Sequence, residues 1–108
     1  MHRLLIPVLA LASSLLAACA STPNQPTETL HTSKSPEAYT DCVMPKLQGP
    51  TQVPTLTQSQ RHYKIVVASA LTADNILEAY KAPTGGKIFL YERGLLANSF
   101  KHAAQECL

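Results

Sequence analysis

The stretch "NILEAYKAPTGGKIFLYER", residues 75–93, decides the fold. It contains two runs, 75–82 and 87–93, on either side of the short segment Pro-Thr-Gly-Gly. The second run is rich in β-branched and aromatic residues, as strands are. The first run is compatible with a helix or a strand, and we choose a strand because a turn and a second strand follow it directly. We therefore predict an antiparallel β-hairpin.

This hairpin has two different faces. We predict a register in which Ala82 lies opposite Lys87, and a shift of this register by one residue would exchange the faces. The apolar face then contains Leu77, Ala79, Ile88 and Leu90. The other face contains Glu78, Tyr80, Phe89, Tyr91 and Arg93. Large aromatic side chains with charges at their edge are unusual on an uncovered sheet face. This face is therefore buried by the loop 48–60, part of the core, or a contact surface.

A third strand is expected upstream of the hairpin. Residues 61–70, "RHYKIVVASA", are β-branched in the middle, and Ile65 and Val67 extend the apolar face. Residues 48–60 hold two prolines, Gly49 and many Thr and Gln, which predicts a loop. The sheet expected from these patterns is a three-stranded antiparallel meander.

Two helices flank the predicted sheet. "SPEAYTDCVMPKLQ" begins with Ser35 as N-cap and Pro36 at the first helical position, and Pro45 should end or bend the helix near Met44. In "GLLANSFKHAAQECL" one helical stripe contains Leu96, Phe100, Ala103, Ala104 and Cys107. We therefore predict an α+β fold over residues 35–108, in which a helix, the meander and a C-terminal helix follow in order and both helices pack on one sheet face.

Cys42 and Cys107 fall on the apolar sides of these two helices. In an exported protein such a pair is usually oxidised, and a bridge closing so long a loop would stabilise the fold by about 4 kcal/mol in the loop-entropy model. Two buried free thiols are the alternative. A two-cysteine metal site is disfavoured because no His lies at ligand spacing from either cysteine.

Export is predicted by the N-terminal residues. A basic start, an apolar run and small residues make residues 1–18 a secretory signal, and the run is too short for a membrane-spanning helix. Leu16-Ala17-Ala18-Cys19 resembles the lipobox of bacterial lipoproteins. That resemblance implies cleavage before Cys19, lipid on Cys19, and outer-membrane sorting because Ala20 rather than Asp follows. Residues 19–34 are polar and proline-bearing, which predicts a flexible tether that holds the domain in the periplasm.

The chain also resembles a group of small uncharacterised lipoproteins of the Pseudomonas type. The residues that carry this resemblance are Ser35, Pro36, Cys42, the turn 83–86 and Cys107, together with the lipobox. It implies a two-cysteine domain behind a lipid anchor and implies no activity.

Catalytic motifs are missing from the sequence. "TGGK", residues 84–87, has neither the preceding glycine nor the following Ser or Thr of a phosphate loop, and there is no HExxH or GxSxG. We therefore expect no enzyme, no metal and no cofactor. Without Arg3, eight basic residues stand against seven acidic ones, a balance that does not indicate nucleic acid binding.

The function expected from these patterns is that of a non-enzymatic binding module at the outer membrane. Its surface would be the face with Glu78, Tyr80, Phe89, Tyr91 and Arg93, and its partner an envelope protein or a second copy in a homodimer. The alternative is an inhibitor of a cell-wall-degrading enzyme such as lysozyme, acting through a protruding loop at 48–60 or 83–86.

Overall fold

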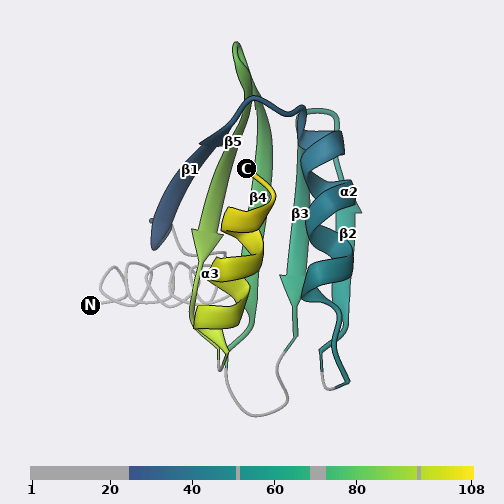
Figure 1. The fold of residues 1–108 in the computed structure, drawn as a ribbon, viewed down its shortest axis with the longest axis vertical. Coiled ribbons are helices and arrows are strands. Elements are labelled where there is room, and N and C mark those ends of the chain that lie inside the picture. Colours follow the sequence, from purple (N-terminus) through teal and green to yellow (C-terminus); the bar gives the residue numbers. More distant parts are fainter. Residues whose placement is uncertain (1–24, 51, 69–72, 95) are drawn as a thin grey trace, which may run out of the picture.

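The computed structural model describes residues 25–50, 52–68, 73–94 and 96–108 (Figure 1). In these residues the chain forms a five-stranded antiparallel sheet of order β1-β5-β4-β3-β2, with two helices on one of its faces (Figure 1). The elements are β1 (Glu28–Thr32), α2 (Pro36–Leu47), β2 (Pro54–Gln58), β3 (His62–Val67), β4 (Asn75–Ala82), β5 (Gly85–Tyr91) and α3 (Ala97–Glu106).

The predicted signal sequence and Cys19 lie outside the described residues. Within the described part of the chain, no helix is both long enough and apolar enough to span a membrane.

The hairpin forms between β4 and β5, but in a different register from the predicted one. Ala82 lies opposite Gly85, so that the loop is only Pro83 and Thr84. The predicted register is wrong by two residues, an even shift that leaves every side chain on its predicted face. Gly85 has a φ of +140°, and a Cβ there would lie 2.3 Å from the carbonyl oxygen of Thr32, so a side chain is excluded.

The three-stranded meander is wrong, because the sheet has two further strands. β2 forms within the segment 48–60 that we predict as a loop. Pro54 is its first residue and pairs with Val67 at the edge of the sheet, where a missing N–H does little harm. The remaining Thr-Leu-Thr-Gln has one large apolar side chain, too few to reveal a strand by alternation.

The other missed strand, β1, forms within the predicted tether. It pairs along β5, with Leu30 opposite Ile88. Leu30 packs partly buried against the core, and Thr32 is buried. The folded part of the chain therefore starts before Ser35, and it does so through pairing with a strand nearly sixty residues away in sequence.

The two helices follow their predicted boundaries with two differences. Ser35 caps α2, since its Oγ accepts from the Ala38 N–H at 3.1 Å. The helix does not end at Met44 but continues past the exposed Pro45 to the buried Leu47. A proline in the last turn removes one hydrogen bond near the helix end, and burial of Leu47 offsets that loss. Leu96, expected on the apolar stripe of α3, is instead an exposed residue before the helix with a φ of 62°.

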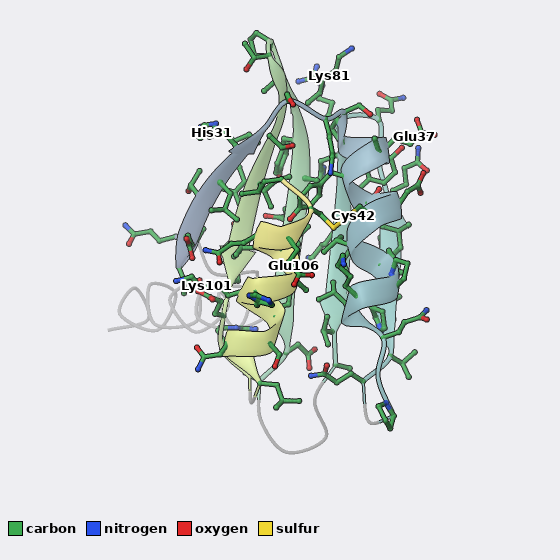
Figure 2. All side chains as sticks on the ribbon, viewed as in Figure 1. His31, Glu37, Cys42, Lys81, Lys101 and Glu106 are labelled. Atoms are coloured by element: carbon green, nitrogen blue, oxygen red, sulfur yellow. A yellow bond between two sulfur atoms is a disulfide. The ribbon has the colours of Figure 1, made fainter. Side chains whose placement is uncertain are left out.

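One core lies between the helices and the sheet. Tyr39 of α2 is fully buried and donates its hydroxyl to the Ala104 carbonyl of α3 at 2.7 Å. Beside it a disulfide joins Cys42 to Cys107, as predicted, and Figure 2 shows this bond against α2. The sheet contributes Ile65, Val67, Leu77, Ala79, Ile88 and Leu90 to the same core.

The end of the chain is tied back to the first strand. Lys34 Nζ donates to the carbonyl of Cys107 at 2.6 Å, and Thr32 Oγ1 donates to that of Leu108 at 3.1 Å. These bonds satisfy carbonyls at the C-terminal end of α3 and hold it next to the end of β1.

The disulfide should provide a large part of the stability. Replacing both Cys42 and Cys107 with Ser opens a cross-link between residues 65 apart in sequence. We expect the free energy of unfolding to fall by about 4 kcal/mol, because the unfolded chain regains the entropy of the open loop. Urea unfolding followed by circular dichroism measures this change, and reduction of the unaltered protein should reproduce it. An unchanged midpoint in both experiments would contradict it.

Candidate functional site

The candidate site is the sheet face that lies opposite α2 and α3, which we call the outer face. Side chains alternate along each strand, and Leu77 and Ala79 of β4 point into the helix-covered core. Glu78 and Tyr80 therefore belong to the outer face. By the same alternation and the strand register, the outer face also contains Thr29, His31, Thr55, Thr57, His62, Lys64, Val66, Ile76, Lys87, Phe89 and Tyr91.

Three rings from three neighbouring strands make contact on this face, and we call them the ring cluster. His62 of β3 stacks on Tyr80 of β4 with ring centroids 4.5 Å apart and planes at 10°. Tyr80 in turn meets Phe89 of β5 edge-on at 5.5 Å and 75°. Lys87 Nζ lies 5.5 Å from the centre of the Phe89 ring, a cation–π contact. The cluster is half-buried, so apolar ring surface and a cation are presented together.

A buried carboxylate lies beside the ring cluster. Glu78 is only 9% exposed, and its Oε2 lies 3.7 Å from His62 Nε2. Burial raises the pKa of Tyr91 to about 12, and the hydrogen bond and negative charge of Glu78 add to the shift. Burial also raises the pKa of Tyr80, with the charge and hydrogen bond of Glu78 as smaller causes. Glu78 therefore interacts with the hydroxyl groups of Tyr80 and Tyr91 and lies near the imidazole of His62. These contacts are made within the protein and hold the rings in place.

Ser59, His62 and Glu78 have the residue types of a Ser-His-acid hydrolytic triad. Ser59 Oγ lies 2.8 Å from His62 Nδ1. The same oxygen also accepts from the His62 main-chain N–H at 3.3 Å and lies 3.2 Å from the His62 carbonyl, which it reaches as a donor. These local bonds are those of a serine that closes a tight turn, here the turn between β2 and β3. We assign Ser59 to the turn.

The structure brings together four of the five residues predicted for the surface. Glu78, Tyr80, Phe89 and Tyr91 lie on the outer face as predicted, but Tyr91 is only 7% exposed and supports the surface from below. Arg93 is exposed and lies two residues beyond the end of β5, where its main-chain N–H donates to Asn75 Oδ1 at 2.9 Å.

Two residues of this site, His62 and Lys87, are not among those predicted from the sequence. Alternation from the buried Ile65 would place His62 on the outer face, but only the pairing of β3 with β4 shows that it lies opposite Tyr80. Lys87 stands in the strand-like run and has the same phase as Phe89, a signal that was present in the sequence.

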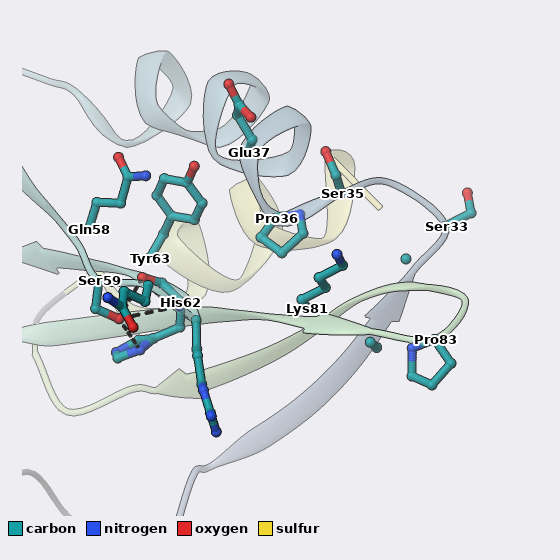
Figure 3. Close-up of a pocket in the computed structure, with 14 residues that line it drawn as sticks. Ser33, Ser35, Pro36, Glu37, Gln58, Ser59, His62, Tyr63, Lys81 and Pro83 are labelled. Carbon is teal, nitrogen blue, oxygen red and sulfur yellow. Dashed lines mark hydrogen bonds between the residues drawn. The ribbon is translucent and has the colours of Figure 1, made fainter.

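A groove of about 490 Å³ lies between the start of α2, the turn after β2 and the β4–β5 hairpin (Figure 3), and it shares His62 with the ring cluster. Its charged side chains are of both signs, since Arg61 and Lys81 stand against Glu37. Among the residues described, no three His, Cys, Asp or Glu side chains cluster as metal ligands. The groove therefore shows no selective chemistry, and the outer face is the better candidate.

Comparison of the chain with family models, curated proteins and solved structures finds no match.

The burial of Tyr91 predicts an alkaline titration. Its folded pKa of about 12 lies above the ordinary 10, so the neutral phenol is favoured by folding. This contribution to stability is complete below pH 10 and is lost as the pH rises from 10 toward 12. In a tyrosinate absorbance titration, Tyr91→Phe should remove a component near pH 12.

Glu78→Gln is the matched variant for this titration. It keeps the shape of the side chain but removes its charge, so the pKa of Tyr91 should fall while staying above 10 because burial is the larger cause. A titration curve that neither variant changes would contradict this description of the face.

Proposed function

We propose that this chain is a lipid-anchored periplasmic protein of the outer membrane and acts as a non-enzymatic binding module through its outer face. The observation that carries the proposal is the ring cluster with its cation, which stands on the face opposite both described helices (Figure 1). Tyrosine and phenylalanine are enriched at protein interfaces, and tyrosine is among the residues that most often act as binding anchors.

The charges of this face indicate the chemistry of the partner. Lys87 is exposed and lies opposite His31, which is also exposed, in the register of β1 and β5. The carboxylate of Glu78 is buried and bonded to tyrosines. The partner surface should therefore combine acidic side chains with apolar ones, as an envelope protein can. Two copies stacked face to face would oppose their lysines, which disfavours this face as a homodimer contact.

The anchor part of the proposal concerns Cys19 and the residues that follow it. With β1 starting at Glu28, the connection from Cys19 has an upper reach of about 30 Å if fully extended. This is shorter than the reach of a tether ending at Lys34. The domain would then work close to the inner surface of the outer membrane, and two or more acyl chains on Cys19 would hold it there stably.

Lipid attachment is tested by the variants Cys19→Ala and Ala20→Asp. Cys19→Ala should lose all acyl mass and leave the membrane fraction, because no acceptor for lipid remains. Ala20→Asp should keep the acyl mass but move to the inner membrane. Intact-mass spectrometry and density-gradient fractionation of envelopes measure both effects. An unaltered protein without acyl mass would refute the anchor.

The outer face is tested by Phe89→Ala and Lys87→Glu, with Lys81→Glu as matched control. Lys81 is exposed on the neighbouring strand β4 but lines the groove at the start of α2. We expect the two outer-face variants to weaken binding of a partner identified by cross-linking in intact cells by tenfold or more, which is the usual effect of losing an interface anchor. Lys81→Glu should bind normally, and equal binding by all three variants would remove the proposal.

The inhibitor alternative is supported by the hairpin between β4 and β5, which projects beyond the other strands (Figure 1). Pro83 and Thr84 at its tip are exposed and suited to entering a cleft. The segment 48–60 is no longer a candidate as a free loop, because it contains β2. Inhibition of lysozyme that disappears when Pro83-Thr84 is replaced by Asn-Gly would favour this function, and no inhibition by the unaltered protein would exclude it.

A further inference from the structure

The strand β2 forms one edge of the sheet and carries no charge. From residue 48 to residue 60 the sequence "QGPTQVPTLTQSQ" contains no acidic, basic or histidine side chain. The opposite edge, β1, holds Glu28 and His31 and is followed by Lys34. Charges on edge strands are a common protection against pairing with another chain. β1 has that protection and β2 lacks it.

The main-chain N–H and C=O groups of successive β2 residues point alternately toward β3 and toward solvent. The Ser59 N–H donates to the His62 carbonyl at 2.9 Å, which makes these residues a hydrogen-bonded pair. In an antiparallel ladder this phase repeats every second residue, so that Thr57 and Thr55 bond toward β3. The N–H and C=O groups of Leu56 and Gln58 therefore point away from the sheet.

Pro54 has the same outward phase as Leu56 and Gln58. Its carbonyl points to the free edge, and the N–H that proline lacks would have pointed there too. The proline thus costs the chain's own sheet no hydrogen bond, but it leaves the free edge without a donor at residue 54, so the outward N–H groups are those of Leu56 and Gln58.

The side chains of this edge are accessible as well. Thr55 and Thr57 are exposed on the outer face, and Leu56 on the helix side is 43% exposed. Val53, directly before the strand, is 73% exposed. A row of free main-chain groups with neutral and apolar side chains is a template for another strand.

We propose that β2 pairs with β2 of a second copy of this chain, antiparallel about a two-fold axis, to form one continuous sheet of two domains. A neutral strand selects neither an acidic nor a basic partner, and its own copy offers the same outward groups without charge repulsion. Such pairing is isologous, so each copy both donates and accepts through Leu56 and Gln58. This contact uses the free edge of β2, whereas the ring cluster lies on β3, β4 and β5 and stays free for its partner.

The experiment uses the full-length chain in detergent micelles over a range of concentrations. Mass is measured by sedimentation equilibrium, and main-chain amide exchange by NMR. We expect a shift from monomer to dimer, with at least tenfold slower exchange at the Leu56 and Gln58 amides in the dimer. The Thr57 amide, which bonds to β3, should be protected in both states.

Two matched variants separate this edge from the other one. Thr57→Lys places a lysine of each copy near the same lysine of the other copy. This holds whether the two-fold axis passes through Leu56, Thr57 or Gln58. The repulsion between the like charges should give a monomer. Thr29→Lys makes the same change at an exposed threonine of β1 and should still dimerise.

A monomer at every concentration overturns the proposal. A dimer whose Leu56 and Gln58 amides exchange as fast as in the monomer also overturns it and moves the contact to another surface. These two results need no variant, so the test holds even if a lysine at position 57 disturbs folding.

Discussion

The Cys42–Cys107 disulfide is the constraint on which the rest of the structure depends. It joins a helix near the start of the folded chain to the helix at its end, next to the buried hydroxyl of Tyr39 on the Ala104 carbonyl. Lys34 and Thr32 then hold the last carbonyls of the chain against the end of β1. Because both helices are fixed to each other, they cover the same face of the sheet (Figure 1). Neither of the two described helices lies over the polar and aromatic residues of the opposite face.

The sequence predicts those parts of the fold that depend on local signals. Ser35 and Pro36 mark the start of α2, and the turn at 83–86 lies between two runs that do form strands. The disulfide follows from cysteine count and helical phase. β1 and β2 were missed because Leu30 and Leu56 are their only large apolar residues, and both strands form through pairing with β5 and β3. The helix end predicted from Pro45 was wrong because a proline in the last turn removes only one hydrogen bond, and the buried Leu47 follows it.

The candidate site was predictable to a similar degree. Alternation along β4 and β5 places Glu78, Tyr80, Phe89 and Tyr91 on one face, and a register error of two residues does not change that. Alternation does not show how deeply each side chain is buried. Tyr91 and Glu78 are buried and work together to support the surface, while His62 joins it from a third strand whose pairing is set by the whole sheet. Arg93 has the right phase, but the strand ends before it. Local patterns therefore identify the face, and tertiary packing decides which of its residues are exposed to a partner.

The central claim is that a partner covers the ring cluster in the envelope, and hydroxyl-radical footprinting tests it most directly. The chain is labelled once as the purified lipidated protein and once in intact envelopes, and modification of each side chain is compared by mass spectrometry. The account predicts that Tyr80, Phe89 and His62 are modified in the purified protein and protected in envelopes, while the buried Tyr39 stays unmodified in both. Equal modification of the ring cluster in the two samples would contradict the account, because a contact surface that is never covered has no partner.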